Sequence, residues 1–256
     1  MPIFRSQPAG LALLTLGGTL HDGQVRRVFN GLRRLLTSRR PPAGLVLRLA
    51  SEGGSVAAAQ AVVELVRQLE AETGARVVTV VDDIAVSAAY YVALAGERVF
   101  VQPGAVLGSI GTVINRYDLS ALARRVGVED VSVTSDDGKR AGQSMVWSPR
   151  FADPQAGAAL VEDIHAQFEA WVLERRGLQT LPDVARHAAS FSGRMAVQNG
   201  LADEEGGTAA AISFLVRELG LARFELLEVD AEASWLARLV QGLPMGGLLA
   251  RWMGLA

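Results

Sequence analysis

The stretch that decides the fold is residues 47–56, which read LRLASEGGSV. It starts inside an apolar run that predicts a strand over residues 44–49, and it ends where helical spacing begins, with Ser55 as the expected N-cap. Between the two, Gly53 and Gly54 let the backbone approach a ligand closely, and the first amides of the helix stay free to bind it. Such amides can hold a developing oxyanion, although a Gly-Gly pair after a strand is often no more than a turn.

Strand and helix alternate on both sides of this unit. From apolar periodicity we expect strands at residues 11–16, 44–49, 77–81, 98–101 and 111–114, and helices at residues 24–39, 55–72 and 87–94. The second half is more helical: we expect helices at residues 119–126, 154–176 and 208–219, strands at residues 130–134 and 224–229, and a polar loop at residues 135–142. Strands separated by such helices favour parallel βα units, an α/β fold and, on this pattern alone, a doubly wound sheet. No repeat or linker is visible, which favours a single domain.

Composition excludes several classes of function. The 256 residues are 50% hydrophobic and 20% charged, which is enough for a sizeable core. A formal net charge of -2 gives no electrostatic basis for binding nucleic acid. The chain has no cysteine, which excludes disulfides and thiolate metal sites, and its three histidines lack the spacing of metal ligands. These are His21, His165 and His187.

The two ends of the chain bear on its location. The apolar run at residues 11–16 is too short to span a membrane and is followed by no cleavage site, so we expect an unexported, cytoplasmic protein. Residues 231–256 form an apolar tail that Gly and Pro interrupt. One interpretation is two short helices that pack on the body or on a sister subunit. The other is an amphipathic anchor with Arg238 and Arg251 at lipid headgroups, which would hold the protein at the inner membrane face.

Lysine usage singles out one residue. Of the 25 basic residues, only Lys139 is a lysine. Arginine-rich coding bias accounts for the general scarcity of lysine but not for this exception. A buried lysine can lose its proton near neutral pH, whereas arginine cannot. Lys139 is therefore either a leftover surface residue or a position where deprotonation is required.

A serine follows the third expected strand. Residues 82–93 read DDIAVSAAYYVA and place Ser87 at the start of a helix of small residues. Its hydroxyl would then lie above the strand ends, near the positive pole of the helix. The alternative is that Ser87 serves only as the N-cap of that helix.

Three segments together resemble the signal peptide peptidase A family of serine peptidases. Residues 50–55, ASEGGS, resemble the family's NSPGGS motif, and residues 83–91, DIAVSAAYY, resemble its nucleophile motif DxAASGGYY. Residues 135–139, SDDGK, resemble the family's SGxxK loop, and the Ser-Pro that follows that loop in the family has a counterpart at residues 148–149.

Further motifs extend the resemblance over about residues 11–228. They are residues 102–111 (QPGAVLGSIG), 191–196 (FSGRMA) and 200–203 (GLAD). The family's fold is the Clp protease/crotonase-like α/β spiral of ββα units. The resemblance implies a single domain of this type with a helical C-terminal part, over residues 1–230, followed by an amphipathic tail at residues 231–256.

The resemblance also implies the roles of the site residues. Ser87 matches the family's nucleophile and Lys139 its general base, so the expected activity is that of a serine endopeptidase with a Ser-Lys dyad. Gly54 matches the oxyanion-hole glycine, and the backbone amide of Ala88 would be the second donor. The substrate groove is expected to include Gly53, Gly108 and Ser109.

Substrates and partners follow from the same resemblance. Family members cleave apolar peptides such as signal-peptide remnants or membrane-protein fragments, need no cofactor or metal, and assemble into homo-oligomeric rings in which the serine and the lysine can come from neighbouring subunits. The chain departs from the family at several places: Ala88 and Ala89 replace glycines, Glu52 replaces proline, and residues 143–147 look like an insertion. We also expect the usual N-terminal membrane anchor of the family to be missing.

Two other functions remain open on the sequence. One is an inactive member that keeps the fold and acts as a scaffold, although the presence of both Ser87 and Lys139 argues against it. The other is a crotonase-like acyl-CoA enzyme, which shares the glycine-backed oxyanion hole and uses a carboxylate. The carboxylates nearest to the first two motifs are Glu52, Asp82 and Asp83.

Overall fold

A computed structural model describes residues 9–115, 119–129, 131, 133, 135 and 154–229 of the chain. Several sequence predictions lie outside these residues: Lys139, the insertion at residues 143–147, the tail at residues 231–256, nearly all of the polar loop at residues 135–142, and most of the strand expected at residues 130–134.

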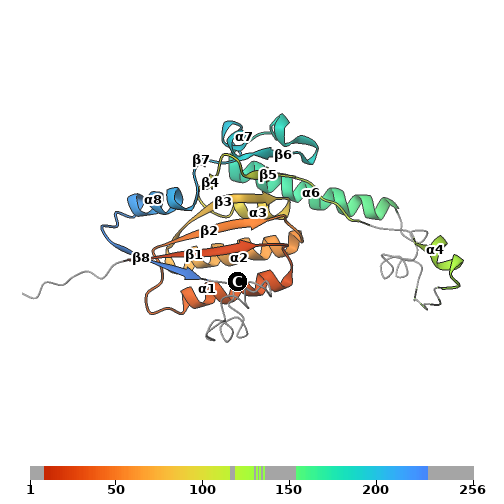
Figure 1. Ribbon diagram of the computed structural model, residues 1–256, viewed down its shortest axis with the longest axis horizontal. Coiled ribbons are helices and arrows are strands. Elements are labelled where there is room, and N and C mark those ends of the chain that lie inside the picture. Colours follow the sequence, from red (N-terminus) through yellow and green to blue (C-terminus); the bar gives the residue numbers. More distant parts are fainter. Residues whose placement is uncertain are drawn as a thin grey trace, which may run out of the picture.

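Within the described residues, one mixed eight-stranded sheet forms the centre of the molecule (Figure 1). Its order is β6-β5-β3-β2-β1-β8, while β4 pairs with β3 and β7 pairs with β4. The parallel centre consists of β1 (Ala9–Gly17), β2 (Gly44–Ser51), β3 (Arg76–Val86) and β8 (Phe224–Val229). This arrangement confirms the predicted parallel βα units.

The long strand β3 changes its partner halfway. Its residues Thr79–Val81 pair with β4 (Val99–Val101), and its residues Ile84–Val86 pair with β5 (Val106–Gly108). On its other side, the register with β2 shifts between Leu49 and Ser51. The carboxyl end of β3 therefore leaves the regular central sheet, and the chain turns there into the helix that follows.

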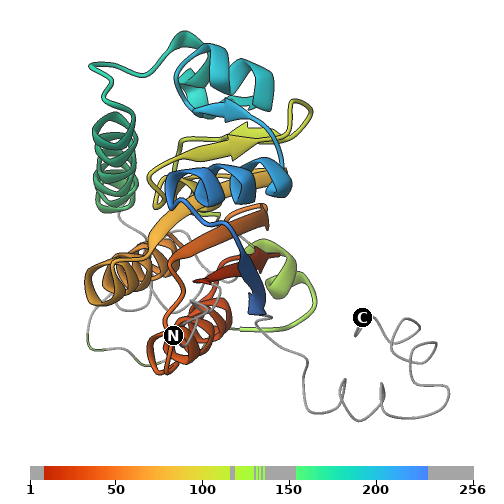
Figure 2. The same ribbon diagram turned by 90° about the vertical axis from the view of Figure 1, so that its left-hand side faces the viewer.

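Helices cover both faces of the sheet (Figure 2). The helices α1 (Asp22–Leu36), α2 (Val56–Thr73), α3 (Ala88–Ala93) and α6 (Pro154–Arg176) contribute to one large apolar core with the strands. On the opposite face, α8 (Thr208–Glu218) packs Phe214 and Leu215 against strand residues such as Val46. Because the central strands are buried on both faces, they read as continuous apolar runs rather than as alternating ones.

Most of the predicted elements are confirmed, and their caps explain where they begin. The Ser55 side chain accepts a hydrogen bond from the Ala58 amide at 3.3 Å and so caps α2 as predicted. The boundaries of α6 and β8 are those predicted, whereas α1 ends at Leu36, three residues early.

One predicted strand is wrong. Residues 111–114 form no strand; the fifth strand is β5, which ends at Gly108. Ser109 then has a φ of 52°, which turns the chain out of the sheet. Val113 and Ile114 beyond this turn are exposed, so their β-branched side chains have no sheet to pack in.

The remaining elements are short and were not predicted. They are the 3-10 helix η2 (Asp183–Ala188), β6 (Ser190–Ser192), α7 (Gly193–Gln198) and β7 (Glu204–Glu205). The short helix α4 (Ser120–Arg125) confirms the helix expected at residues 119–126 and lies away from the sheet, at the right of Figure 1.

Candidate active site

Ser87 sits in a sharp turn between β3 and α3. Its backbone has φ 53° and ψ -132°, a conformation that a residue other than glycine rarely adopts. Its amide donates to the Gly108 carbonyl at 2.8 Å, and its carbonyl accepts from the Tyr90 amide at 2.8 Å. The side chain makes no capping hydrogen bond, so the interpretation of Ser87 as a simple helix cap is wrong. A strained backbone of this kind is typical of functional sites.

The Gly-Gly turn lies directly beside Ser87. Gly53 has a φ of 93°, and a Cβ there would lie 2.7 Å from the Val86 carbonyl oxygen and 2.9 Å from the Ser87 Cβ. The Gly53 carbonyl accepts a hydrogen bond from the Leu20 amide at 2.7 Å, which holds the turn in place. The two predicted motifs, far apart in the sequence, therefore meet backbone to backbone, and only glycine leaves room for that approach.

The two predicted oxyanion donors belong to this junction. Gly54 is exposed and has a φ of 142°. Ala88 is the first residue of α3, so its amide has no acceptor within the helix. An amide at a helix start next to a serine is suited to hold negative charge.

The predicted groove residues Gly108 and Ser109 close the other side of Ser87. Gly108 has a φ of 107° and provides the carbonyl that accepts from the Ser87 amide. Ser109 has a φ of 52°, and its amide donates to the Ala189 carbonyl at 2.9 Å. The junction thus continues from β5 to the segment that contains η2.

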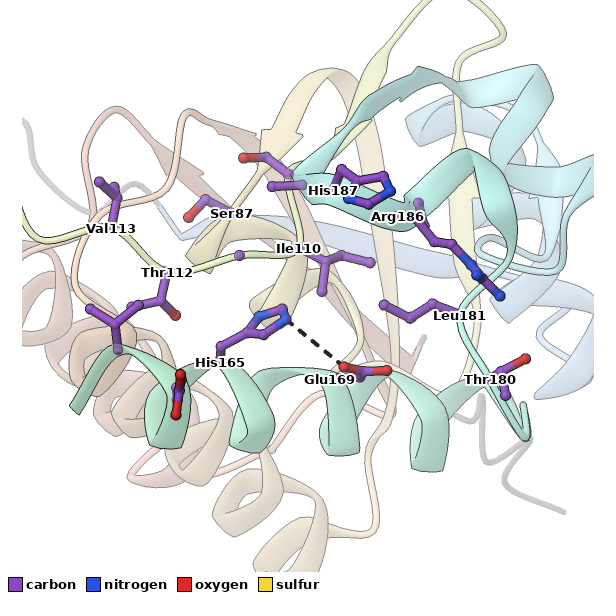
Figure 3. A pocket seen from close by; sticks show the side chains of 16 residues that line it. Ser87, Ile110, Thr112, Val113, His165, Glu169, Thr180, Leu181, Arg186 and His187 are labelled. Atoms are coloured by element: carbon purple, nitrogen blue, oxygen red, sulfur yellow. Dashed lines mark ion pairs between the residues drawn. The ribbon is translucent and has the colours of Figure 1, made fainter. Parts of the chain in front are cut away.

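A cavity of about 730 Å³ opens at this junction (Figure 3). Ser87 and Ser109 lie on its wall together with residues 110–113, while α6 and η2 form its other sides. The α6 residues in the wall include Glu162, His165 and Glu169. The His165 Nε2 lies 3.9 Å from a Glu169 carboxylate oxygen, and both side chains are partly exposed.

Sequence reasoning missed the α6 side of the cavity. Glu162, His165 and Glu169 are spaced three and four residues apart, which places them on one face of the helix. That spacing is visible in the sequence, but it indicates only a polar helix face. Nothing in it says that this face turns towards Ser87.

The carboxylates considered for a crotonase-like enzyme are not in the cavity wall. Asp82 caps α8: its carboxylate accepts from the Thr208 hydroxyl at 2.8 Å and from the Thr208 amide at 3.3 Å. Glu52 and Asp83 are exposed. Among the described residues, no group of three or more His, Asp or Glu side chains gathers as a metal site would require.

A buried polar anchor supports α3 from behind. The Tyr90 hydroxyl donates to the Leu201 carbonyl at 2.7 Å, and burial raises the pKa of this tyrosine. Two residues on, Asp203 accepts from the Val99 amide at 2.7 Å and from both terminal nitrogens of Arg176 at 2.9 Å. Burial opposes the charged form of Asp203, but these hydrogen bonds outweigh it, and the pKa of Asp203 is lowered. The sequence motif at residues 200–203 thus has a structural role.

Two protein-family models match this chain. The model of peptidase family S49 matches residues 70–222, more than half of the chain, and the model of the Clp protease family matches residues 11–107. The first match includes Ser87, and the second includes the Gly-Gly turn and Ser87.

Several individual proteins are similar to this chain. A protein of Enterococcus faecium, named as an inferred signal peptide peptidase SppA, is 24% identical over 220 residues, which are 83% of this chain and 60% of that protein. A protein of Synechocystis sp., slr0021, named as an inferred protease, is 26% identical over 210 residues, which are 80% of this chain and 73% of that protein.

A third relative is named as an antiporter rather than as a peptidase. A Na(+)/H(+) antiporter NhaA of Brucella melitensis is 29% identical over 221 residues, which are 84% of this chain but only 28% of that longer protein. None of the helices in the described part of this chain combines the length and the apolar character that crossing a bilayer requires. The S49 model covers more than half of the chain, so the chain belongs to peptidase family S49, and its mixed α/β sheet is that of the Clp protease/crotonase-like fold.

Proposed function

We propose that the chain is a serine endopeptidase in which Ser87 is the nucleophile and Lys139 is the general base. The observation that carries this proposal is the strained conformation of Ser87, whose side chain makes no capping bond and lies in the wall of a cavity. A helix cap needs neither the strain nor the cavity. A nucleophile needs its hydroxyl presented to substrate, and the position of Ser87 in the cavity wall supports this role.

The reaction follows from these groups. The neutral amine of Lys139 takes the proton of the Ser87 hydroxyl as the oxygen attacks the substrate carbonyl. The negative charge that develops on the carbonyl oxygen is held by the amides of Gly54 and Ala88. The lysine then returns the proton to the leaving amine, and water, activated by the same lysine, hydrolyses the acyl-enzyme. The base requires a lysine pKa below its ordinary value, so the rate should rise with pH as the amine loses its proton.

Assembly is part of this proposal. We expect a homo-oligomeric ring in which Ser87 and Lys139 of one site can come from neighbouring subunits. The segment around α4 supports this, because Val113, Leu122, Val126 and Val131 are all strongly exposed there. A run of exposed apolar side chains is typical of an interaction surface, and a second copy of the chain is the partner we propose for it.

The proposed substrates are apolar peptides, such as signal-peptide remnants or membrane-protein fragments, met in the cytoplasm or at the inner membrane face. Residues 231–256, which lie outside the described residues, would then provide a peripheral contact with the membrane. The proposed reaction uses no cofactor.

The absence of cysteine from the chain allows a specific test of the dyad. A Lys139→Cys variant carries a single thiol, which 2-bromoethylamine converts to the aminoethyl thioether, an amine of nearly the same length as lysine. We expect a fluorophosphonate probe to label Ser87 in the wild type, to fail with Lys139→Cys, and to label Ser87 again after aminoethylation. Mass spectrometry of the adduct distinguishes Ser87 from Ser109 in the same cavity.

The possible results separate the alternatives. Labelling of Lys139→Cys at the wild-type rate would exclude Lys139 as the base. Absence of labelling in folded, assembled wild-type protein would favour the inactive scaffold, and binding of acyl-CoA by that protein would favour the crotonase-like enzyme.

A further inference from the structure

The cavity beside Ser87 has an acidic side. Glu162 and Glu169 of α6 both line it, one on each side of His165 along the helix. In Figure 3, His165 points from α6 into the cavity, and Glu169 lies next to it. Among the described residues, the other titratable groups of the wall are His165, His187 and one arginine.

The described part of the cavity wall contains one arginine, and it does not balance these carboxylates. Arg186 forms an ion pair with Asp183, with its Nε 3.0 Å from a carboxylate oxygen, and more than half of the Arg186 side chain is exposed. Both members of that pair belong to η2. Two glutamates therefore face the cavity against a guanidinium that already has an acidic partner.

The cavity also contains buried polar atoms without a partner among the described residues. They are the Thr112 hydroxyl oxygen and the Nδ1 of His165. Leaving such atoms unpaired is unfavourable, and each is expected to bond water or a ligand. An apolar side chain in the cavity would leave them unsatisfied, whereas a side chain with a polar end would not.

Much of the rest of the wall is apolar. It includes Ile110, Val113, Val161 and Leu181, together with the polar Thr180. A long side chain with a methylene stem and a charged end matches this combination of surfaces, because the stem packs on apolar residues while the head reaches the polar ones.

We propose that this cavity binds a basic side chain of the peptide substrate, arginine above all, at a position next to the scissile bond. The inference rests on the proposed function, because only a nucleophilic Ser87 makes the neighbouring cavity a substrate subsite. Glu169 is the principal partner: it is less exposed than Glu162 and adjoins His165. A guanidinium has five donors and no acceptor, which suits a wall of carboxylates and a hydroxyl. A basic residue next to an apolar stretch also occurs in signal peptides.

Peptidyl diphenyl phosphonates test this selectivity at Ser87 itself. Their phosphorus binds the serine oxygen as a phenolate leaves, and they can carry arginine, citrulline, lysine or leucine next to the reactive group. Citrulline has the shape of arginine without its charge. We expect the arginine probe to label Ser87 at least about tenfold faster than the citrulline probe, because removing the charge from a hydrogen-bonded pair weakens binding about tenfold or more.

The matched variants are Glu169→Gln and Glu174→Gln. Both residues lie on α6, but only Glu169 lines the cavity. We expect Glu169→Gln to reduce the ratio of the arginine rate to the citrulline rate to below about threefold and Glu174→Gln to leave it unchanged. Equal rates for the arginine and citrulline probes in the wild type, or a leucine probe that is faster than both, would overturn the inference.

The proposed function can fail separately. If a small fluorophosphonate labels Ser87 and the arginine probe shows no preference, the function stands and the subsite assignment is wrong. If no phosphonate labels Ser87, binding of benzamidine is measured by ligand-observed NMR. Binding that a Glu162→Gln, Glu169→Gln double variant removes would support the basic subsite without the peptidase, and no binding to the wild type would overturn it.

Discussion

Replacing Gly53 with alanine tests whether the Gly-Gly turn supports the nucleophile. The added Cβ would lie 2.7 Å from the Val86 carbonyl oxygen, 2.9 Å from the Ser87 Cβ and 3.1 Å from the Ala88 nitrogen. All three atoms belong to the backbone or sit next to it, so no flexible side chain can move aside. The turn must shift, and Ser87 and Ala88 must shift with it.

The cost has two parts. An alanine with φ near 93° costs about 1–2 kcal/mol in backbone strain. The collision adds about 1–3 kcal/mol, as overpacking of a tight site does. We expect the free energy of unfolding to fall by about 2–5 kcal/mol in total, which a domain of ordinary stability survives. A displacement of about 1 Å at the nucleophile should reduce the rate of Ser87 labelling about a hundredfold.

Two other glycines provide controls. Gly74 caps α2 with a φ of 68° and has nothing within 4 Å of an added Cβ, so Gly74→Ala measures backbone strain alone, about 1 kcal/mol. Gly104 has no positive φ and no atom within 4 Å of an added Cβ, so Gly104→Ala should change the free energy of unfolding little. Urea denaturation gives the stabilities, and fluorophosphonate labelling gives the rates. A Gly53→Ala protein that labels Ser87 at the wild-type rate would refute the argument that this turn positions the nucleophile.

Two further predictions concern stability and assembly. Asp203→Asn removes the charge that Arg176 and the Val99 amide bind, so we expect a loss of about 2–3 kcal/mol at neutral pH, against less than about 0.5 kcal/mol for Asp183→Asn in an exposed pair. The pKa of Asp203 is lower in the folded state, so its contribution to the free energy of unfolding is present above the unfolded pKa and is lost as pH falls through the folded pKa. The difference in stability between Asp203→Asn and wild type should therefore shrink in acid. A difference that stays constant down to about pH 2 would contradict this. Val126→Asp should reduce assembly in analytical ultracentrifugation, whereas Met195→Asp, an exposed apolar residue on α7, should not; wild-type assembly in Val126→Asp would exclude α4 as the interface.

Much of the fold was predictable because the hydrophobic periodicity of each segment indicates the helix or strand that it forms. The helix at residues 154–176 and the strand at residues 224–229 match their predicted boundaries, since both carry enough residues for the pattern to be read. The strands β6 and β7 have three and two residues, too few for any period to appear. The strand expected at residues 111–114 failed because β-branched residues are common in exposed segments as well as in sheets.

By itself, the sequence determined the order of the parallel βα units and the motif that contains Ser87, because hydrophobic period, glycine position and residue type are properties of short stretches of chain. The tertiary structure alone decided what surrounds that serine. The indole nitrogen of Trp171 on α6 donates to the Tyr91 carbonyl on α3 at 3.0 Å, and Arg175 donates to the Leu94 carbonyl at 2.8 Å. These long-range contacts fix the rotation of α6, which turns Glu169 rather than Glu174 towards the cavity. No local pattern specifies that rotation, because it depends on packing between segments about eighty residues apart.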